Sequence, residues 1–369
     1  MHEGPSVKKI VLLPGDGVGP EIMQQSVKLL RALEEPFDLR FEFEELPVGG
    51  KSMKQFGVPL SAETLEACQA ADAVLLGPVG DAAYDKNPDE LRPKHALVEL
   101  RTGLGAYCNI RSIRVRNVVP QHLPVTSTVT KNIDFVVVQT MRNGYYYHEI
   151  AHKNAHWETT PERSTFSKSE IRRVARRAFQ LAQIRRRKLT AVTDLSSPTS
   201  SRMWRSIVEE THAEYPGVKL ELVHITDAIE MLDRSPYEFD VIFSESRYAM
   251  KVNEAAGKLS ESVGMLASAC LGSGVSIFQP IHDTDQKIVG KNLANPIAMM
   301  NSIALMLHYS FGMSLAAHNI EDAIAAVVAR GYHTIDMPVP NGVAVGTEEM
   351  VNYVLEEVLH CLGAPFLTA

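Results

Sequence analysis

The polar residues with the clearest capacity for binding chemistry lie in one stretch, residues 282–296. A β-branched and aromatic run at 275–278 precedes it, and from Pro296 onward apolar residues recur at helical spacing. Pro296 suits the first helical position, where a missing N–H costs no hydrogen bond. Loops held between two rigid elements often carry binding sites, so we predict a ligand loop; a solvated surface loop is the open alternative. Its polar members are His282, Asp283, Asp285, Lys287, Lys291, Asn292 and Asn295.

Two arginines, Arg101 and Arg111, form a second candidate group. A guanidinium binds a carboxylate through two parallel hydrogen bonds, so this pair suits a small organic acid. Most arginine side chains are solvated, and two exposed charges are the competing interpretation.

Three histidines at four-residue spacing form a third group, His148, His152 and His156. On a helix they would share one face and could bind a metal. Trp157, the threonine pair before Pro161 and the proline itself disfavour a helix here, so the role of these histidines stays open.

The elements that must position these groups alternate between strand and helix. A strand at 7–13 ends in a turn with Gly15, Gly17 and Gly19, followed by a helix, although the spacing is not Gly-x-Gly-x-x-Gly. Alternating strands and helices predict an α/β fold with parallel strands. Further strands are expected at 37–46, 73–76, 133–138, 189–192, 218–223 and 239–243, and helices at 61–68, 169–183, 202–215, 320–329 and 347–362. We interpret Arg185, Arg186, Arg187 and Lys188 as a solvated helix end.

Composition limits the classes of protein to consider. A net charge of −7 over 369 residues argues against general nucleic-acid binding, which needs a basic surface. No apolar run reaches the roughly 18 residues typical of a membrane span, and residues 1–9 lack a signal pattern. Four distant cysteines suggest reduced thiols and a cytoplasmic protein without a disulfide framework or zinc site.

Several motifs together resemble the isocitrate/isopropylmalate dehydrogenase family, whose members oxidise and decarboxylate 2-hydroxy acids with NAD(P) and a divalent metal. The motifs are residues 13–21, 100–101 with 109–111, 262–272, 280–291 and 294–296. The resemblance implies a two-domain α/β fold with the active-site cleft between domains. Residues 1–106 and 262–369 would form a discontinuous dinucleotide-binding domain with a parallel-rich sheet. Residues 107–261 would form an inserted α/β substrate and dimerisation domain, giving a homodimer or higher even oligomer.

The resemblance also assigns substrate roles by position. Arg101 and Arg111 match the family's carboxylate-binding arginines, and Tyr146 matches its catalytic tyrosine. Gln139 stands at a third arginine position and Asp194 at the catalytic lysine position, which reverses the charge there. Lys94 is a further candidate for binding an anionic substrate.

Cofactor roles follow from the ligand loop. His282 and Asn295 match adenine-side positions, and Lys287 stands where NADP-dependent members use a cation for the 2′-phosphate. Asp283 and Asp285 would oppose that phosphate, so both NADP and NAD stay open, with NADP favoured.

The metal positions of the family are altered in this sequence. Met250 and Glu254 stand where two aspartates are expected, and Thr226 stands at a third position beside Asp227. A hard divalent cation needs several oxygen ligands, so we expect no magnesium or manganese site.

Three functions remain under consideration. The first is a diverged dehydrogenase that binds a small carboxylate in the cleft, with NAD(P), but does not perform ordinary metal-dependent oxidative decarboxylation. The second is a repurposed metal-free lyase, isomerase or decarboxylase acting on an anionic substrate. The third is a non-catalytic pseudo-dehydrogenase, a pseudoenzyme serving as a subunit or sensor.

Overall fold

The computed structural model describes residues 6–115, 133–141, 167–196, 200–260 and 262–363. The chain divides into two compact units, residues 1–105 with 261–369, called unit 1, and residues 106–260, called unit 2. The dinucleotide-binding and dimerisation roles assigned to the two domains stay predictions. Within the described ranges, no helix is both long and apolar enough to cross a membrane.

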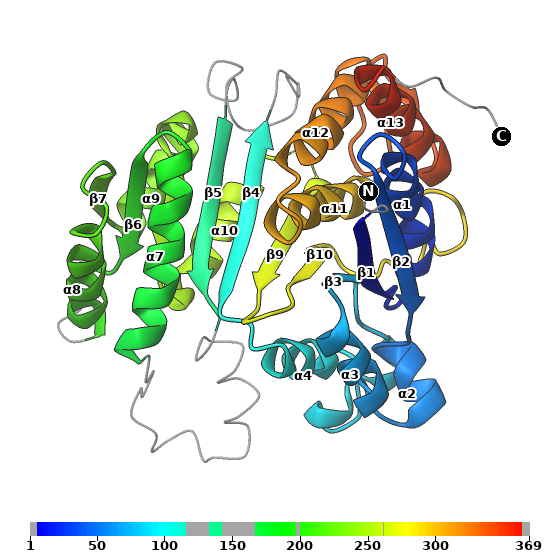
Figure 1. The fold of residues 1–369 in the computed structure, drawn as a ribbon, viewed down its shortest axis with the longest axis horizontal. Helices are drawn as coiled ribbons and strands as arrows, with labels where there is room; N and C mark the ends of the chain where they lie inside the picture. Colours follow the sequence, from blue (N-terminus) through cyan, green and yellow to red (C-terminus); the bar gives the residue numbers. More distant parts are fainter. Residues whose placement is uncertain (1–5, 116–132, 142–166, 197–199, 261, 364–369) are drawn as a thin grey trace, which may run out of the picture. The chain divides into compact units, whose positions relative to one another are not determined.

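In the described part of unit 1, the main sheet has five strands in the order β2-β1-β3-β10-β9 (Figure 1). Their bounds are β1 Ser6–Leu13, β2 Leu39–Glu45, β3 Ala73–Leu76, β9 Ala267–Leu271 and β10 Ile277–Pro280. The first four in this order are parallel, and β9 runs antiparallel to β10. The carboxyl ends of β1, β3 and β10 therefore meet at one edge of the sheet.

The helices of unit 1 are arranged around α11, which packs on β3, β9 and β10 and against α1 and α12. Ten of the thirteen α11 residues are buried, so an apolar helix of this kind must be central. The helices are α1 Gly19–Leu33, α2 Gly50–Phe56, α3 Ala62–Ala70, α4 His95–Gly103, α11 Ile297–Tyr309, α12 Ser314–Ala329 and α13 Thr347–Cys361. A short ribbon of β11 Tyr332–His333 and β12 Val343–Ala344 lies between α12 and α13 in the chain.

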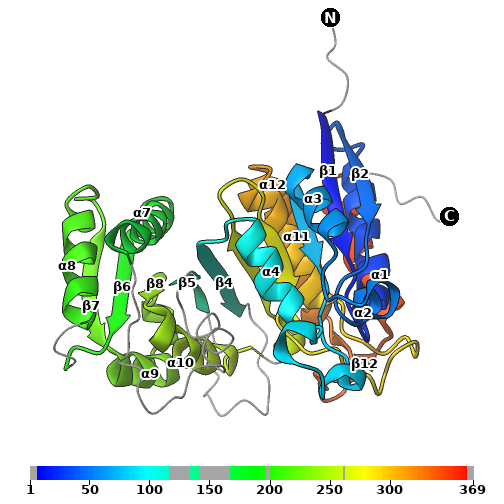
Figure 2. The ribbon, with the colours of Figure 1, turned by 90° about the horizontal axis from the view of Figure 1, so that it is seen from below.

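Unit 2 contains the strand order β4-β5-β8-β6-β7, parallel except for β4. The strands are β4 Cys108–Val115, β5 Ile133–Thr140, β6 Lys188–Thr193, β7 Lys219–His224 and β8 Val241–Ser244. Helix α7 (Lys168–Ile184) lies on one face, and α9 (Ile225–Arg234) and α10 (Ser246–Gly257) lie on the other (Figure 2). Helix α8 (Ser200–His212) packs beside α7.

Helix α7 illustrates how local sequence sets the fold. Ser167 accepts a hydrogen bond from the Glu170 N–H while the Glu170 side chain accepts one from the Ser167 N–H, which forms a capping box. Ile171, Val174 and Ala178 then recur at helical spacing and are buried. The outer face carries arginines.

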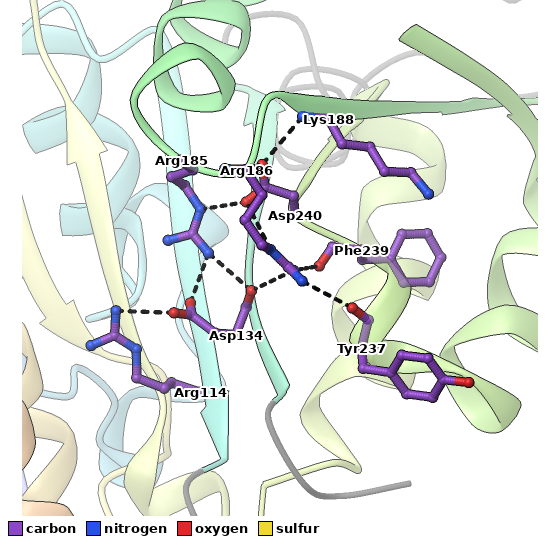
Figure 3. A network of polar contacts seen from close by, with 8 residues as sticks. All are labelled: Arg114, Asp134, Arg185, Arg186, Lys188, Tyr237, Phe239 and Asp240. Atoms are coloured by element: carbon purple, nitrogen blue, oxygen red, sulfur yellow. Dashed lines mark hydrogen bonds and ion pairs between the residues drawn. The ribbon is translucent and has the colours of Figure 1, made fainter. Parts of the chain in front are cut away.

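A polar network closes the amino edge of the unit 2 sheet, where β5 and β8 begin (Figure 3). The Arg185 guanidinium bridges two carboxylates, with Nη2 2.7 Å from Asp134 Oδ1 and Nε 2.9 Å from Asp240 Oδ1. Asp240 is 1% exposed and also accepts a hydrogen bond from the Arg186 N–H. Burial alone would raise the pKa of Asp134, but Arg114 and Arg185 outweigh it and hold that pKa below its usual value.

This network corrects the prediction of a solvated helix end at Arg185 and Arg186, whereas Arg187 is exposed as predicted. Arg185 is largely buried, and Arg186 reaches the main-chain carbonyls of Asp134 and Tyr237. The partners lie about fifty residues away in sequence, so only strand register brings them to the arginines.

Candidate functional site

The carboxyl edge of the unit 1 sheet brings together three loops, which follow β1, β3 and β10. The Asp16 N–H donates to the Pro78 carbonyl at 2.8 Å, and the Val18 N–H donates to the Thr284 carbonyl at 2.9 Å. Ligands of open parallel sheets bind at this edge. The predicted ligand loop therefore lies where the topology favours binding.

The glycine turn fits the ligand loop closely. Gly17 has a φ of +58°, and a Cβ at this position would lie 2.0 Å from the Thr284 carbonyl oxygen. Glycine is required here for both backbone conformation and space.

Asp16 holds the turns together from inside. Its carboxylate accepts N–H bonds from Gly80 at 2.8 Å, Gly50 at 3.0 Å and Lys51 at 3.2 Å. Burial raises the pKa of Asp16 despite these bonds. Because its carboxylate accepts three backbone N–H bonds, Asp16 positions the turns. The contacts that distinguish one ligand from another would then come from the ligand loop.

The ligand loop is fastened at its far end as well. The Gly290 N–H donates to Glu21 Oε2 at 3.1 Å, and Thr347 Oγ1 donates to Glu21 Oε1 at 2.8 Å. The Glu348 N–H donates to Asn292 Oδ1 at 2.9 Å, which satisfies a donor in the first turn of α13. The loop thus has a defined course between fixed points.

His282 offers an acceptor to a ligand. Its Nδ1 lies 2.9 Å from the Asp283 carbonyl, which can only accept, so Nδ1 carries the proton in this contact. In the neutral form of the ring Nε2 is therefore the acceptor; it is buried and has no hydrogen-bond partner within the described ranges. A ligand N–H donor would satisfy it.

Asn295 and Lys287 differ in their availability. The Asn295 amide is already engaged: Nδ2 donates to Asp336 Oδ2 at 3.0 Å and Oδ1 accepts from the Ile297 N–H at 2.9 Å. A contact from Asn295 to a ligand would come from its main chain or require exchange of these bonds. Lys287 is exposed.

The remaining unit 1 candidates lie near α4. Lys94 precedes this helix, and its Nζ lies 3.4 Å from Asp283 Oδ1, with both side chains mostly exposed. The structure therefore links Lys94 to the ligand loop, a contact that the sequence did not predict. Arg101 is in the last turn of α4, and its Nε is buried.

In unit 2, the carboxyl ends of the parallel strands carry a row of polar groups. Gln139 on β5 is opposite Ser244 on β8, which is opposite Val192 on β6. Arg111 on β4 is opposite Val137, two residues before Gln139, so Arg111 and Gln139 share a face.

Gln139 is fixed from α10. Asn253 Nδ2 donates to Gln139 Oε1 at 2.8 Å, which leaves the Gln139 amide nitrogen as a donor rather than the cation that an arginine would provide. A neutral amide supports a weaker anion contact than a guanidinium.

Asp194 follows β6 and lies beside His224, the last residue of β7. Their Oδ1 and Nδ1 atoms are 3.7 Å apart, and each side chain is 27% exposed. Asp194 Oδ1 accepts hydrogen bonds from the Ser196 N–H at 2.9 Å and the Ser196 hydroxyl at 2.6 Å. The Leu195 N–H donates to His224 Nδ1 at 3.0 Å, so the neutral ring carries its proton on Nε2.

His224 was missed by sequence reasoning. A polar residue directly after the predicted strand 218–223 was the available signal. Thr193 on β6 is opposite His224 on β7, and this register brings the carboxylate and imidazole together.

The altered metal positions lie on two helices of unit 2. Met250 on α10 is 47% exposed, and Glu254 follows one turn later. Thr226 and Asp227 lie in the first turn of α9. Among the described residues, no group of three or more His, Cys, Asp or Glu side chains is placed to hold a metal. A thioether at Met250 is a poor ligand for a hard cation, so these residues do not fit the family's site.

Some predicted residues lie outside the described residues. They are Tyr146 and the three histidines His148, His152 and His156.

Comparison with known proteins agrees with the fold and the motifs. Residues 9–354 match the isocitrate/isopropylmalate dehydrogenase family. The chain belongs to this family. A 3-isopropylmalate dehydrogenase of Desulfitobacterium hafniense is 40% identical over 352 residues, covering 94% of this chain and 99% of the relative. One from Clostridium acetobutylicum is 38% identical, covering 95% and 99% respectively.

Two solved dehydrogenase structures share the fold. A β-decarboxylating dehydrogenase from Thermococcus kodakarensis in its apo form has a TM-score of 0.78 at 26% identity, covering 96% of this chain and 97% of that one. Isocitrate dehydrogenase from Methylococcus capsulatus has a TM-score of 0.77 at 24% identity, covering 95% and 99%. The predicted α/β fold of this dehydrogenase family is confirmed. The curated relatives carry the name of an ordinary dehydrogenase, and they lend no support to the pseudoenzyme hypothesis.

Proposed function

We propose that this family member is a dehydrogenase that binds a dinucleotide on unit 1, with NADP favoured over NAD, and oxidises a small carboxylate-bearing hydroxy acid. The observation that carries the proposal is His282 Nε2, a buried acceptor without a partner in the described part of the chain. It lies in the loop that follows β10 at the carboxyl edge of the sheet. The exocyclic amine of an adenine is a donor of the required kind.

Lys287 is proposed to contact the 2′-phosphate. Its exposed ammonium can approach a phosphate without a desolvation cost comparable to that of a buried charge. Asp283 is paired with Lys94, which offsets part of the negative charge that would oppose a phosphate.

Arg101 and Arg111 are proposed as ligands for the acid's carboxylate groups. Arginine's planar donors suit this role, and Gln139 provides a neutral donor on the same strand face as Arg111. The substrates of the relatives make 3-isopropylmalate the first acid to test, followed by isocitrate.

Proton transfer is proposed to involve Asp194 and His224 together with Tyr146. A carboxylate beside an imidazole can accept and pass a proton near neutral pH, as general acid–base catalysis requires. In the family pattern a lysine stands at the Asp194 position, so the proton route would differ from that of lysine-containing members.

Magnesium or manganese is proposed to be dispensable, because Met250 replaces an oxygen ligand and the other metal positions are incomplete. The family reaction uses a divalent cation to stabilise the developing negative charge on oxygen. A member without it would be slower or would use a substrate that places less charge there.

Calorimetric titration of the whole chain with NADP⁺ and NAD⁺ tests the cofactor proposal. His282→Ala should weaken both by about tenfold, because a good hydrogen bond is lost. Lys287→Asp should weaken NADP⁺ alone, and Lys54→Asp, the same change at an exposed lysine on α2 outside the ligand loop, is the matched control. Failure to bind either dinucleotide would exclude the dehydrogenase proposal and favour the sensor or metal-free hypotheses.

Turnover tests the substrate and metal proposals. Reduction of the dinucleotide by 3-isopropylmalate and isocitrate should be measured with Mg²⁺, with Mn²⁺ and with a chelator. A rate that is unchanged by the chelator supports a metal-independent reaction. A rate abolished by the chelator would contradict the metal proposal and indicate the ordinary metal-dependent reaction of the family. Arg111→Ala should raise the KM for the acid.

A further inference from the structure

An arginine-lined groove lies on unit 2 along the outer face of α7. It measures about 560 Å³, within the range of small-molecule sites, about 300 to 1,000 Å³. It is called the arginine groove here, and it is lined by Tyr107, Ser169, Arg172, Arg173, Arg176, Arg177 and Gln180. None of these described lining residues is acidic.

The four guanidinium groups are partly ordered by their neighbours. Arg172 Nη2 lies 2.7 Å from Glu210 Oε2, and Arg176 makes two 2.8 Å bonds to the Glu214 carboxylate on the chain beside α8. The Arg173 guanidinium carbon lies 3.6 Å from the centre of the Tyr107 ring. A stacked and paired set of arginines loses less freedom on binding an anion than four solvated side chains would.

The charge of the groove departs from that of the whole chain. The protein carries a net −7, yet four arginines and the amino-terminal turn of α7, at Ser169, face one hollow. An ordinary solvated helix face intersperses both signs. We propose that the arginine groove binds a small molecule bearing two or more phosphate groups.

The glutamate partners determine the class of anion. A monocarboxylate would compete poorly with Glu210 and Glu214, because these carboxylates belong to the same chain and already lie beside the arginines. A polyphosphate brings several charges and several acceptor oxygens, so it can displace one carboxylate while keeping contacts with the other arginines.

The test is calorimetric titration of the full chain with sodium pyrophosphate and sodium tripolyphosphate at constant ionic strength. The double variant Arg172→Gln/Arg176→Gln should weaken tripolyphosphate binding about tenfold or more, because charge-assisted bonds are lost. Glu210→Gln/Glu214→Gln should act in the opposite direction and tighten binding several-fold. Arg40→Gln, an exposed arginine on β2 of unit 1, is the matched control and should leave affinity unchanged.

Other results would overturn the proposal. These are no measurable binding, equal weakening by Arg40→Gln, or weaker binding in the glutamate variants when circular dichroism shows them folded. Binding abolished by Lys287→Gln would assign the phosphate to the proposed dinucleotide loop instead of the groove. Binding of an RNA oligonucleotide without tripolyphosphate binding would also contradict it.

Discussion

Charged side chains are paired differently at the two edges of the unit 2 sheet. At the amino edge, Asp240 is 1% exposed and is enclosed by Arg185 and by the main-chain N–H groups of Arg186 and Lys188, while Asp134 accepts a second bond from Arg185 (Figure 3). At the carboxyl edge, Asp194 and His224 are a quarter exposed, and the atoms that face each other are 3.7 Å apart, too far for a hydrogen bond. Closed pairing is typical of a scaffold, whereas polar groups with remaining capacity and solvent access are typical of a site.

The largest expected effect comes from opening the amino edge. Asp240→Ala removes the buried acceptor of Arg185 Nε and of the Arg186 N–H, and leaves a mostly buried guanidinium with one carboxylate fewer. We expect a loss of about 3–5 kcal/mol in the free energy of unfolding, as when one partner of a buried pair is removed. Urea denaturation measures it, and a loss below about 1 kcal/mol would contradict the scaffold assignment.

Asp194→Asn makes the matching change at the carboxyl edge. The amide keeps an acceptor for Ser196, so unfolding should change by less than about 1 kcal/mol. The rate of dinucleotide reduction should fall about a hundredfold, mainly in kcat, because a proton acceptor is lost. If Asp194→Asn lowers the free energy of unfolding but keeps the rate of dinucleotide reduction, the carboxyl edge is the scaffold and not the site.

The pH dependence of stability tests the amino edge at Asp134. Its pKa is lower in the folded chain than its ordinary value of 3.8, so the ionised carboxylate stabilises the fold above that value. This stabilisation is lost as pH falls through the lower, folded pKa. Thermal unfolding should therefore show that the loss of stability between neutral pH and pH 3 is smaller for Asp134→Asn than for the parent chain. The difference should be smaller than the effect of Asp240→Ala, because Asp134 is 42% exposed.

The smallest effect is expected at Met250. Met250→Asp on the exposed face of α10 should alter the free energy of unfolding by less than about 0.5 kcal/mol. It should also leave the Mg²⁺ dependence of the rate unchanged, because one added carboxylate does not complete an oxygen site. A new Mg²⁺ requirement in the single variant would show that the site is nearer to completion than its residues suggest.

The fold was largely predictable, since strand 73–76 is a continuous apolar run and helix 347–361 has apolar residues at helical spacing. The polar arrangements were less so. Asp194 was identified from its motif position, but its neighbour His224 lies thirty residues away and becomes adjacent only through the β6–β7 register. Arg185 was misinterpreted for the same reason, because local sequence contains a cation but not the carboxylates of Asp134 and Asp240.

The close fit of Gly17 against the Thr284 carbonyl has a consequence for protein engineering. The turn and the ligand loop belong to distant parts of the chain, yet their main chains are in direct contact, as the 2.9 Å bond from Val18 to Thr284 also records. A chimera that imports residues 282–296 from a relative to change cofactor preference would place a foreign main chain against an unchanged turn. We expect such grafts to retain their affinity only when residues 14–20 are transplanted from the same donor.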